Sequence, residues 1–147
     1  MEKLKTRHNS VLKALESFRK SIAAYQQAVK EKEALSYATN EEIEIFFRDS
    51  VVQRFEYCTD LFWKLLKDYL EHQIKQLPEI IGPNHIFRAA SQAKLITEAE
   101  ASDAIDMVKD RNLTSHMYHE EIAVVLCKNA PKYYELMSAI TYRLKTK

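Results

Sequence analysis

The scarcity of glycine and proline restricts this chain more than any other feature of its sequence. Its 147 residues include one glycine, Gly82, and three prolines. All-β folds need many tight turns, and tight turns rely on glycine and proline, so this composition favours long helices. Hydrophobic residues make up 46% of the chain and charged residues 29%, which is typical of a globular protein. We therefore expect one all-α domain over residues 1–147.

The net charge and the lack of long apolar segments limit which partners and which cellular location we expect. The formal net charge of +1 gives no overall attraction to nucleic acid, so any phosphate contact must come from a local patch. The sequence has no apolar core of signal-peptide type and no uncharged run of membrane-spanning length, so we expect a cytoplasmic protein without membrane contact. Cys58 and Cys127 lack CxxC spacing, and we expect buried thiols rather than a disulfide or a metal site.

Two long amphipathic segments open the chain. The first is expected from about Lys3 to Tyr37, because apolar residues recur there at helical spacing: Leu4, Val11, Leu15, Phe18, Ile22, Tyr25 and Val29. Thr39-Asn40 followed by two glutamates predicts an N-cap, and the second helix should run from about Glu41 to Leu77. The inner stripe of this second helix would be Ile43, Phe47, Val51, Phe55, Cys58, Phe62, Leu65 and Tyr69.

A second set of apolar residues widens the stripe of the second helix: Phe46, Leu61, Trp63, Leu66 and Leu70. One explanation is a surface that meets another subunit. The other is that the remaining helices of the same chain cover it. The sequence does not choose between the two.

The second half of the chain is divided by breaks. Gly82-Pro83 marks the clearest one, and a short helix is expected from about Asn84 to Ala93. The next helix should run from Thr97, with Thr97 or Ser102 as its cap, to near Asp110. A last helix is expected from near His116, with a kink or break near Asn129-Ala130 because Pro131 lies inside its pattern. These segments predict an antiparallel, four-helix-type bundle with an additional short helix.

The stretch Arg111-Asn112-Leu113-Thr114-Ser115-His116-Met117-Tyr118 is the densest group of chemically active side chains. On an unbroken helix, residues five apart point about 140° from each other, so Arg111 and His116 could not easily share a substrate. Asn112, Thr114 and Ser115 favour turns, which predicts a turn over Arg111–Ser115. That turn would gather an arginine, a histidine and a helix N-terminus into a phosphate site able to transfer protons. The alternative is a solvated arginine and histidine at two helix ends.

Three further groups each allow two interpretations. His116, His119 and Glu120 have spacing that could suit a metal, but zinc needs three or four ligands and no cysteine is near, so we expect no metal and no cofactor. Asp49, Gln53 and Glu56 share one helix face, flanked by Arg48 and Arg54. This face could be a polar wall of a cleft or a contact surface for a partner, or it could be a solvated stripe. The C-terminal basic residues could follow an RNA backbone or form a solvated tail: Lys128, Lys132, Arg143, Lys145 and Lys147.

Arg111 to Tyr118 fits the pattern Arg-x4-His-x-Tyr and resembles the motif of the HepT-like branch of the HEPN proteins. Arg48–Tyr57, with Trp63-Lys64 after it, and Gly82–Ala90 look like segments of the proteins known as nucleotidyltransferase substrate-binding subunits. The resemblance extends from about residue 5 to residue 143.

This resemblance implies a HEPN-like bundle that forms a homodimer, with both Arg-x4-His motifs lining one cleft. It also implies a metal-independent endoribonuclease, the toxin partner of a separate MNT nucleotidyltransferase antitoxin. His116 would transfer protons during attack of a ribose 2′-OH on the adjacent phosphate, and Arg111 would hold that phosphate. Asn112 and Ser115 would support the geometry. The substrate would be RNA, either tRNA or mRNA, because the chemistry uses the 2′-OH.

In the resembling toxins, the tyrosine of the motif receives AMP units from the MNT partner. Carried onto Tyr118, such an addition would bring negative charge and bulk that repel RNA phosphates and fill the cleft. An ordinary helix tyrosine is the alternative for this residue. Two other functions stay open for the chain: a non-catalytic subunit that presents a small substrate to a nucleotidyltransferase, and an oligomeric helical scaffold without a site.

Overall fold

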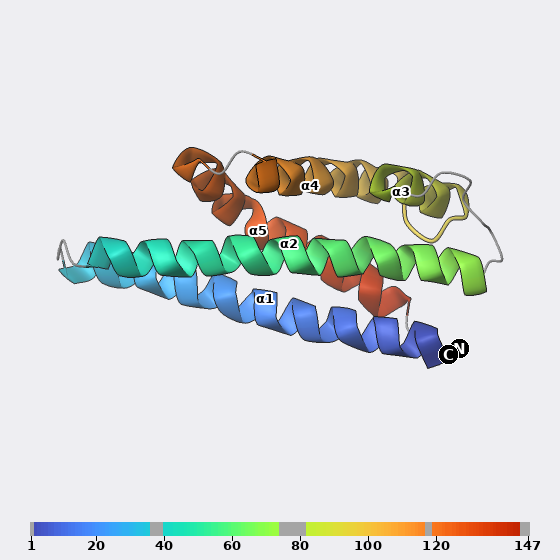
Figure 1. Ribbon diagram of the computed structural model, residues 1–147, viewed down its shortest axis with the longest axis horizontal. Helices are drawn as coiled ribbons and strands as arrows, with labels where there is room; N and C mark the ends of the chain where they lie inside the picture. The colour runs from blue at the N-terminus through green and yellow to red at the C-terminus, as the bar shows by residue number, and fades with distance from the viewer. Residues whose placement is uncertain (1, 36–39, 74–81, 117–118, 145–147) are drawn as a thin grey trace.

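The structure, a computed structural model, describes the backbone of residues 2–35, 40–73, 82–116 and 119–144; the side chains of residues 32–35, 40, 115 and 116 lie outside this description. Within these ranges it contains five helices and no strand, which confirms the all-α expectation (Figure 1). The helices are α1 (Glu2–Leu35), α2 (Asn40–His72), α3 (Pro83–Gln92), α4 (Glu98–His116) and α5 (Glu120–Arg143).

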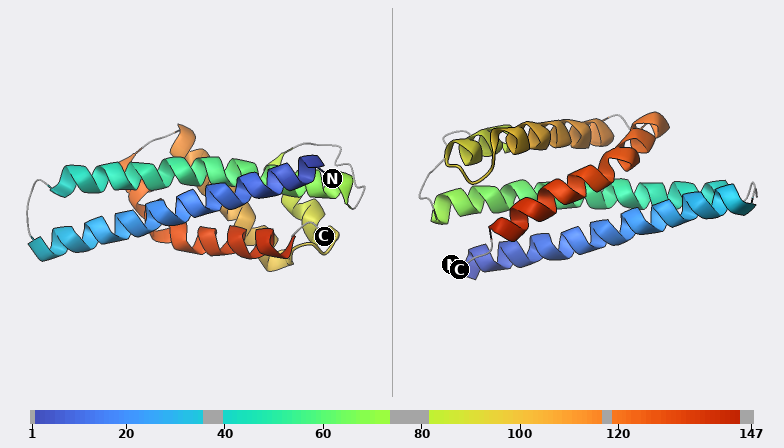
Figure 2. Two further views of the ribbon diagram at one scale, coloured as in Figure 1. Left: turned by 90° about the horizontal axis from the view of Figure 1, so that it is seen from below. Right: turned by 180° about the vertical axis from the view of Figure 1, so that it is seen from behind.

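The helices form layers on the two sides of α2. The long helices α1 and α2 lie side by side as an antiparallel hairpin, while α3 and α4 lie along the opposite side of α2 (Figure 1). Helix α5 runs obliquely across the bundle and contacts α1, α2 and α4 (Figure 2). Near the far end of α5, His8 on α1 shares a buried 2.9 Å hydrogen bond with the backbone carbonyl of Thr141.

The apolar stripes predicted for α1 and α2 meet in the core. Leu4, Val11, Leu15, Phe18 and Ile22 of α1 are buried, as is the stripe of α2 from Val51 through Leu65. The ring of Phe55 lies 5.9 Å from that of Phe18 and 5.5 Å from that of Tyr133 on α5, measured between centroids. Aromatic contacts of this kind add to area burial, so this cluster ties three helices together.

Most of the second apolar set on α2 is covered by other helices of the same chain. Leu66 and Leu70 are buried in the core, while Leu61 and Trp63 are partly buried against it. Phe46 is 72% exposed, and Ile43, predicted for the inner stripe, is also exposed, so that assignment was wrong. The first turns of α2 extend past α5, which leaves α1 as their neighbour in the hairpin (Figure 1).

The turn predicted over Arg111–Ser115 is wrong. Helix α4 continues through these residues to His116, and α5 begins only at Glu120 instead of near His116. The hydroxyl of Thr114 donates a 2.7 Å hydrogen bond to the carbonyl of Arg111, one turn earlier in the same helix. A side chain that could compete with the helix is therefore accommodated by it.

The proline inside α5 does not break the helix. The helix continues over Glu120–Arg143 with Pro131 inside it, and its ribbon bends along its length (Figure 2). A proline removes one backbone N–H and crowds the carbonyl four residues earlier, which bends a helix when packing holds both halves. Ala130 and Tyr133 on either side of the proline are both buried.

Two other expectations concern the cysteines and the membrane. Cys58 and Cys127 are buried free thiols, as predicted, and burial raises the pKa of each to about 12. None of the described helices combines the length and the apolar character needed to cross a membrane.

Candidate functional site

Arg111 faces α2 and is held there by carboxylates. Its Nε donates a 3.1 Å hydrogen bond to Oδ1 of Asp60, and its Nη2 donates a 2.9 Å hydrogen bond to Oδ2. Its Nη1 lies 3.7 Å from Oε2 of Glu56, one turn earlier on α2. The side chain of Arg111 is 23% exposed and that of Asp60 is 38% exposed. The hydrogen bonds that Arg111 donates to Asp60 raise the pKa of Arg111, which therefore keeps its charge at any physiological pH.

The backbone next to Arg111 is also held by α5. The hydroxyl of Tyr133 on α5 donates a hydrogen bond to the carboxylate of Asp110, the residue before Arg111. Burial is the main reason why the pKa of Tyr133 is raised well above its usual value, and the hydrogen bond to Asp110 is the second. The hydroxyl therefore keeps its proton. This part of α4 is thus tied to α2 through Asp60 and to α5 through Tyr133.

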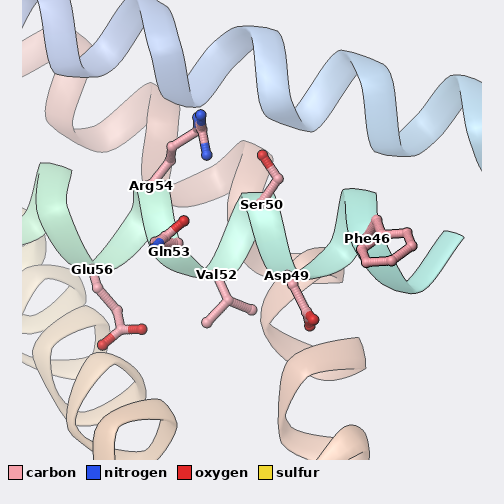
Figure 3. Close-up of a pocket in the computed structure, with 7 residues that line it drawn as sticks. All are labelled: Phe46, Asp49, Ser50, Val52, Gln53, Arg54 and Glu56. Atoms are coloured by element: carbon pink, nitrogen blue, oxygen red, sulfur yellow. The ribbon is translucent and has the colours of Figure 1, made fainter. Parts of the chain in front are cut away.

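A shallow hollow of about 410 Å³ opens on α2, and Figure 3 shows its lining residues. The lining residues that the structure describes all lie on α2: Phe46, Asp49, Ser50, Val52, Gln53, Arg54 and Glu56. The three polar residues expected on one face, Asp49, Gln53 and Glu56, all line it. Since Glu56 also lies beside Arg111, the hollow and the arginine cluster are neighbours.

The two arginines that flank this polar face serve as structural ties. Arg48 is buried, and its Nη2 forms a 3.1 Å ion pair with Oε1 of Glu120 in the first turn of α5. Nε of Arg54 donates a 3.1 Å hydrogen bond to the hydroxyl of Ser17 on α1. Both link α2 to a neighbouring helix.

The remaining residues of the Arg-x4-His-x-Tyr motif are placed only in part. His116 is the last residue of α4, so it shares one continuous helix with Arg111. Asn112 is exposed. The side chains of Ser115 and His116 and all of Tyr118 lie outside the described residues. The structure therefore brings Arg111 together with Asp60 and Glu56, while the meeting of Arg111 and His116 stays a prediction.

Sequence reasoning missed Asp60. A signal was present, because Asp60 continues the spacing of Asp49, Gln53 and Glu56 by one further helical step of four residues. Its role depends on Arg111, which is 51 residues away in the sequence, and periodicity alone cannot reveal such a pairing.

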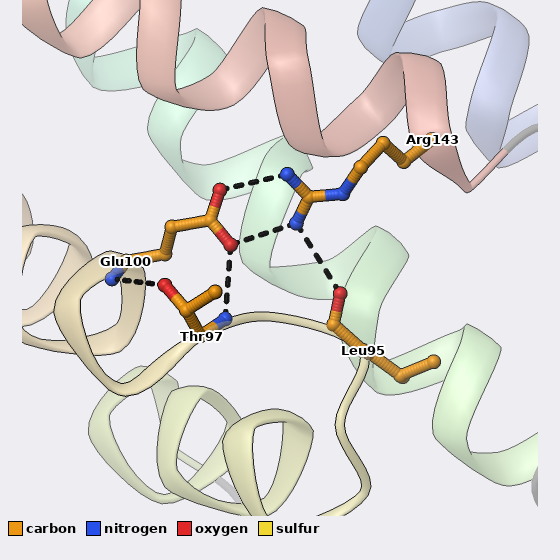
Figure 4. A network of polar contacts seen from close by, with 4 residues as sticks. All are labelled: Leu95, Thr97, Glu100 and Arg143. Carbon is orange, nitrogen blue, oxygen red and sulfur yellow. Dashed lines mark hydrogen bonds and ion pairs between the residues drawn. The ribbon is translucent and has the colours of Figure 1, made fainter.

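Arg143, from the basic C-terminal segment, is engaged at the other end of α4 (Figure 4). Its Nη1 and Nη2 donate hydrogen bonds of 2.8 and 2.7 Å to the two carboxylate oxygens of Glu100, and Nη2 also donates to the carbonyl of Leu95 at 3.3 Å. Thr97 caps the start of α4, as predicted, by accepting a 3.0 Å hydrogen bond from the N–H of Glu100. Lys145 and Lys147 lie outside the described residues.

His116, His119 and Glu120 have a spacing that could suit a metal ion. Among the side chains that the structure describes, no group of three or more histidine, cysteine or acidic residues could hold a metal ion. His116 is not among those side chains. His119 takes the N-cap position of α5 without a side-chain cap hydrogen bond.

Comparison with known proteins places this arrangement in context. A family model described as "nucleotidyltransferase substrate binding protein like" matches residues 13–146. A search of curated proteins found no match. A solved structure from Thermus thermophilus is 30% identical, with a TM-score of 0.63, over 83% of this chain and 99% of that one.

Toxin structures share the fold at lower identity. A toxin–antitoxin complex with AMP-PNP is 17% identical, with a TM-score of 0.65, over 93% of this chain and 97% of that one. A tri-AMPylated HEPN toxin of Shewanella oneidensis in complex with an MNT antitoxin is 18% identical, with a TM-score of 0.63 and the same coverage. At such identities the likeness shows a shared fold.

Proposed function

The chain belongs to the nucleotidyltransferase substrate binding protein like family and has the HEPN fold, and we propose that it is a toxin with metal-independent endoribonuclease activity. The observation that carries this proposal is Arg111, a charged guanidinium fixed in orientation at the α2–α4 surface and belonging to an Arg-x4-His-x-Tyr motif. An oriented arginine suits a phosphate better than a mobile one, because it loses less freedom when it binds.

The proposed reaction is an internal transfer at an RNA phosphate. His116 accepts the proton of a ribose 2′-OH, and the 2′ oxygen then bonds to the adjacent phosphorus. The bond from phosphorus to the 5′ oxygen breaks, and that oxygen takes up a proton, which leaves a 2′,3′-cyclic phosphate and a 5′-OH. Arg111 stabilises the negative charge that builds on the phosphate oxygens. Asn112 and Ser115 support this arrangement.

The continuous course of α4 favours a homodimeric site. Positions 111 and 116 leave the axis of one unbroken helix about 140° apart, so one chain does not readily aim both at one phosphate. Two copies that juxtapose the ends of their α4 helices would offer two arginines and two histidines to one cleft. The homodimer is therefore part of the proposal, as is its action on tRNA or mRNA in the cytoplasm.

The proposed partner is an MNT-type nucleotidyltransferase that adenylylates Tyr118 and so neutralises the toxin. Support comes from the tri-AMPylated HEPN toxin whose fold this chain shares. Tyr118 lies two residues beyond His116, so an AMP group there would bring a negative charge to the same helix end that must receive RNA. Intact mass after incubation with ATP and the nucleotidyltransferase should rise by whole AMP units, and Tyr118→Phe should abolish the rise.

A second candidate is a non-catalytic subunit that presents a small substrate to a nucleotidyltransferase. The family description favours it, and so does the contact of Arg111 with two carboxylates, since a guanidinium already neutralised has less charge to offer RNA. In this function the chain would bind its substrate without cutting RNA.

Expression of the chain alone separates these two functions. We expect growth arrest and cleavage of cellular RNA, both of which disappear with His116→Ala. His85→Ala, on the exposed surface of α3, is the matched control and should behave as the wild type. Harmless expression of a folded wild-type protein that leaves tRNA and mRNA intact would contradict the ribonuclease proposal and favour the binding subunit.

A further inference from the structure

We propose that Asp60 is a positioning residue of the site, acting through Arg111 to set the direction from which the guanidinium meets a phosphate. The inference rests on the proposed ribonuclease function and adds to it a residue outside the Arg-x4-His-x-Tyr motif. Asp60 lies on α2, and Arg111 lies on α4, so the contact also sets the position of one helix against the other.

The geometry of the pair supplies the first reason. Both oxygens of Asp60 accept hydrogen bonds, one from Nε at 3.1 Å and one from Nη2 at 2.9 Å. Two parallel bonds fix the plane of a guanidinium, whereas one bond would let it turn. The contact uses the edge formed by Nε and Nη2, so a phosphate would have to approach the guanidinium from the edge formed by Nη1 and the second N–H of Nη2.

Glu56 offers a comparison on the same guanidinium. Its Oε2 lies 3.7 Å from Nη1, which is too long for a hydrogen bond, so it contributes charge without direction. A phosphate that approaches the Nη1 edge would meet the negative charge of Glu56. We therefore assign opposite effects to the two carboxylates: Asp60 orients Arg111, and Glu56 weakens the attraction of RNA to it.

Asp60 could both orient Arg111 and repel an incoming phosphate, and its solvent exposure determines which effect is larger. Its side chain is 38% exposed, so water and salt screen its repulsion of an incoming phosphate. Screening does not replace the two hydrogen bonds that set the plane of the guanidinium. Loss of Asp60 should therefore harm the chemical step more than it helps binding.

The test measures steady-state cleavage of a fluorescein-labelled RNA oligonucleotide of mixed sequence by the purified full-length chain. Asp60→Asn should lower kcat by about 10- to 100-fold, with KM changed less than about threefold, because a misplaced group costs rate rather than affinity. Asp60→Glu keeps two carboxylate oxygens and should recover part of kcat. Glu56→Gln, the matched control one turn away, should lower KM and leave kcat within about threefold.

A double substitution tests whether Asp60 acts through Arg111. A lysine cannot form the two-bonded contact, so Asp60→Asn should change kcat by less than about threefold when it is added to Arg111→Lys. A general structural role of Asp60 would instead lower kcat in both backgrounds.

The outcomes separate this inference from the proposed function. If the wild type and His116→Ala are equally inactive, the ribonuclease proposal fails. If only His116→Ala is inactive and Asp60→Asn keeps or exceeds the wild-type kcat, the positioning role of Asp60 is overturned. Should Asp60→Asn lose its helical circular dichroism, Asp60→Glu decides instead: a kcat reduced by roughly 3- to 10-fold at constant KM supports the role, and a wild-type kcat overturns it.

Discussion

The two ends of α4 carry the same kind of contact with different surroundings. At the start of α4, Arg143 of α5 donates hydrogen bonds to both carboxylate oxygens of Glu100. Towards the end of α4, Arg111 donates hydrogen bonds to both carboxylate oxygens of Asp60 on α2. The first pair also reaches the backbone carbonyl of Leu95 and adjoins the Thr97 cap (Figure 4). The second pair adjoins another carboxylate and a hollow on α2.

The contrast shows that a two-bonded arginine is not by itself a sign of function. Arg143 completes a network of backbone and side-chain groups that closes on itself and anchors the beginning of a helix. Arg111 instead sits where negative charge from two residues meets an open surface, and it belongs to a motif that ends in a histidine and a tyrosine.

The largest expected effect is a difference in RNA cleavage rate between substitutions of the two arginines. Arg111→Ala should lower the rate of RNA cleavage by about 100- to 1,000-fold, because it removes a group that stabilises transition-state charge. Arg143→Ala should leave cleavage unchanged and affect only stability. Both rates would be measured on purified proteins at a temperature where circular dichroism shows them folded. Equal losses in the two variants would break the distinction between the two ends.

The next effect concerns the helix segment under Arg111. Tyr133→Phe removes the hydroxyl that donates to Asp110 and should lower the free energy of unfolding by about 1–2 kcal/mol, measured by urea denaturation at neutral pH. Burial raises the pKa of Tyr133, so its contribution is complete below the usual tyrosine pKa and is lost as pH rises. The gap between wild type and variant should therefore narrow at strongly alkaline pH; a gap that widens there would contradict this account.

The smallest effect concerns the start of α4. Glu100→Gln should lower the free energy of unfolding by about 0.5–1 kcal/mol at neutral pH, since the pair is partly exposed. The hydrogen bond from Arg143 lowers the pKa of Glu100, so its contribution is complete above the usual value of 4.5 and is lost as pH falls further. Urea denaturation across this range should show the difference disappearing in acid, while RNA cleavage at neutral pH stays at the wild-type rate.

Sequence periodicity predicted the long helices well and their junctions poorly. The stripes of α1 and α2 were readable because many turns repeat the same spacing, so a single exception such as Ile43 does not hide the pattern. The end of α4 depends on fewer residues. Asn112, Thr114 and Ser115 favour a turn, yet Thr114 bonds back to its own helix, and Asp110 and Arg111 are held by other helices. Tertiary contacts therefore decided the junction.

The candidate site was predictable only in the part that lies within a motif. Arg111, His116 and Tyr118 are close in sequence, whereas Asp60 of α2 contacts Arg111 and Tyr133 of α5 contacts the preceding residue, Asp110. No local pattern links Asp60 to Arg111. The role of a carboxylate at the end of a polar helix face can be assigned only when the helix packed against it is known.

The hydrogen bond between His8 and Thr141 has a consequence for synthesis on the ribosome. The two residues are 133 positions apart, so at about 5–20 residues per second α1 waits roughly 7–27 s for this partner. During that time the α1–α2 hairpin can form, but its face toward α5 stays open. The nascent chain therefore lacks the rings that pack against Phe18 and Phe55 until Tyr134 and Tyr133 of α5 have been synthesised.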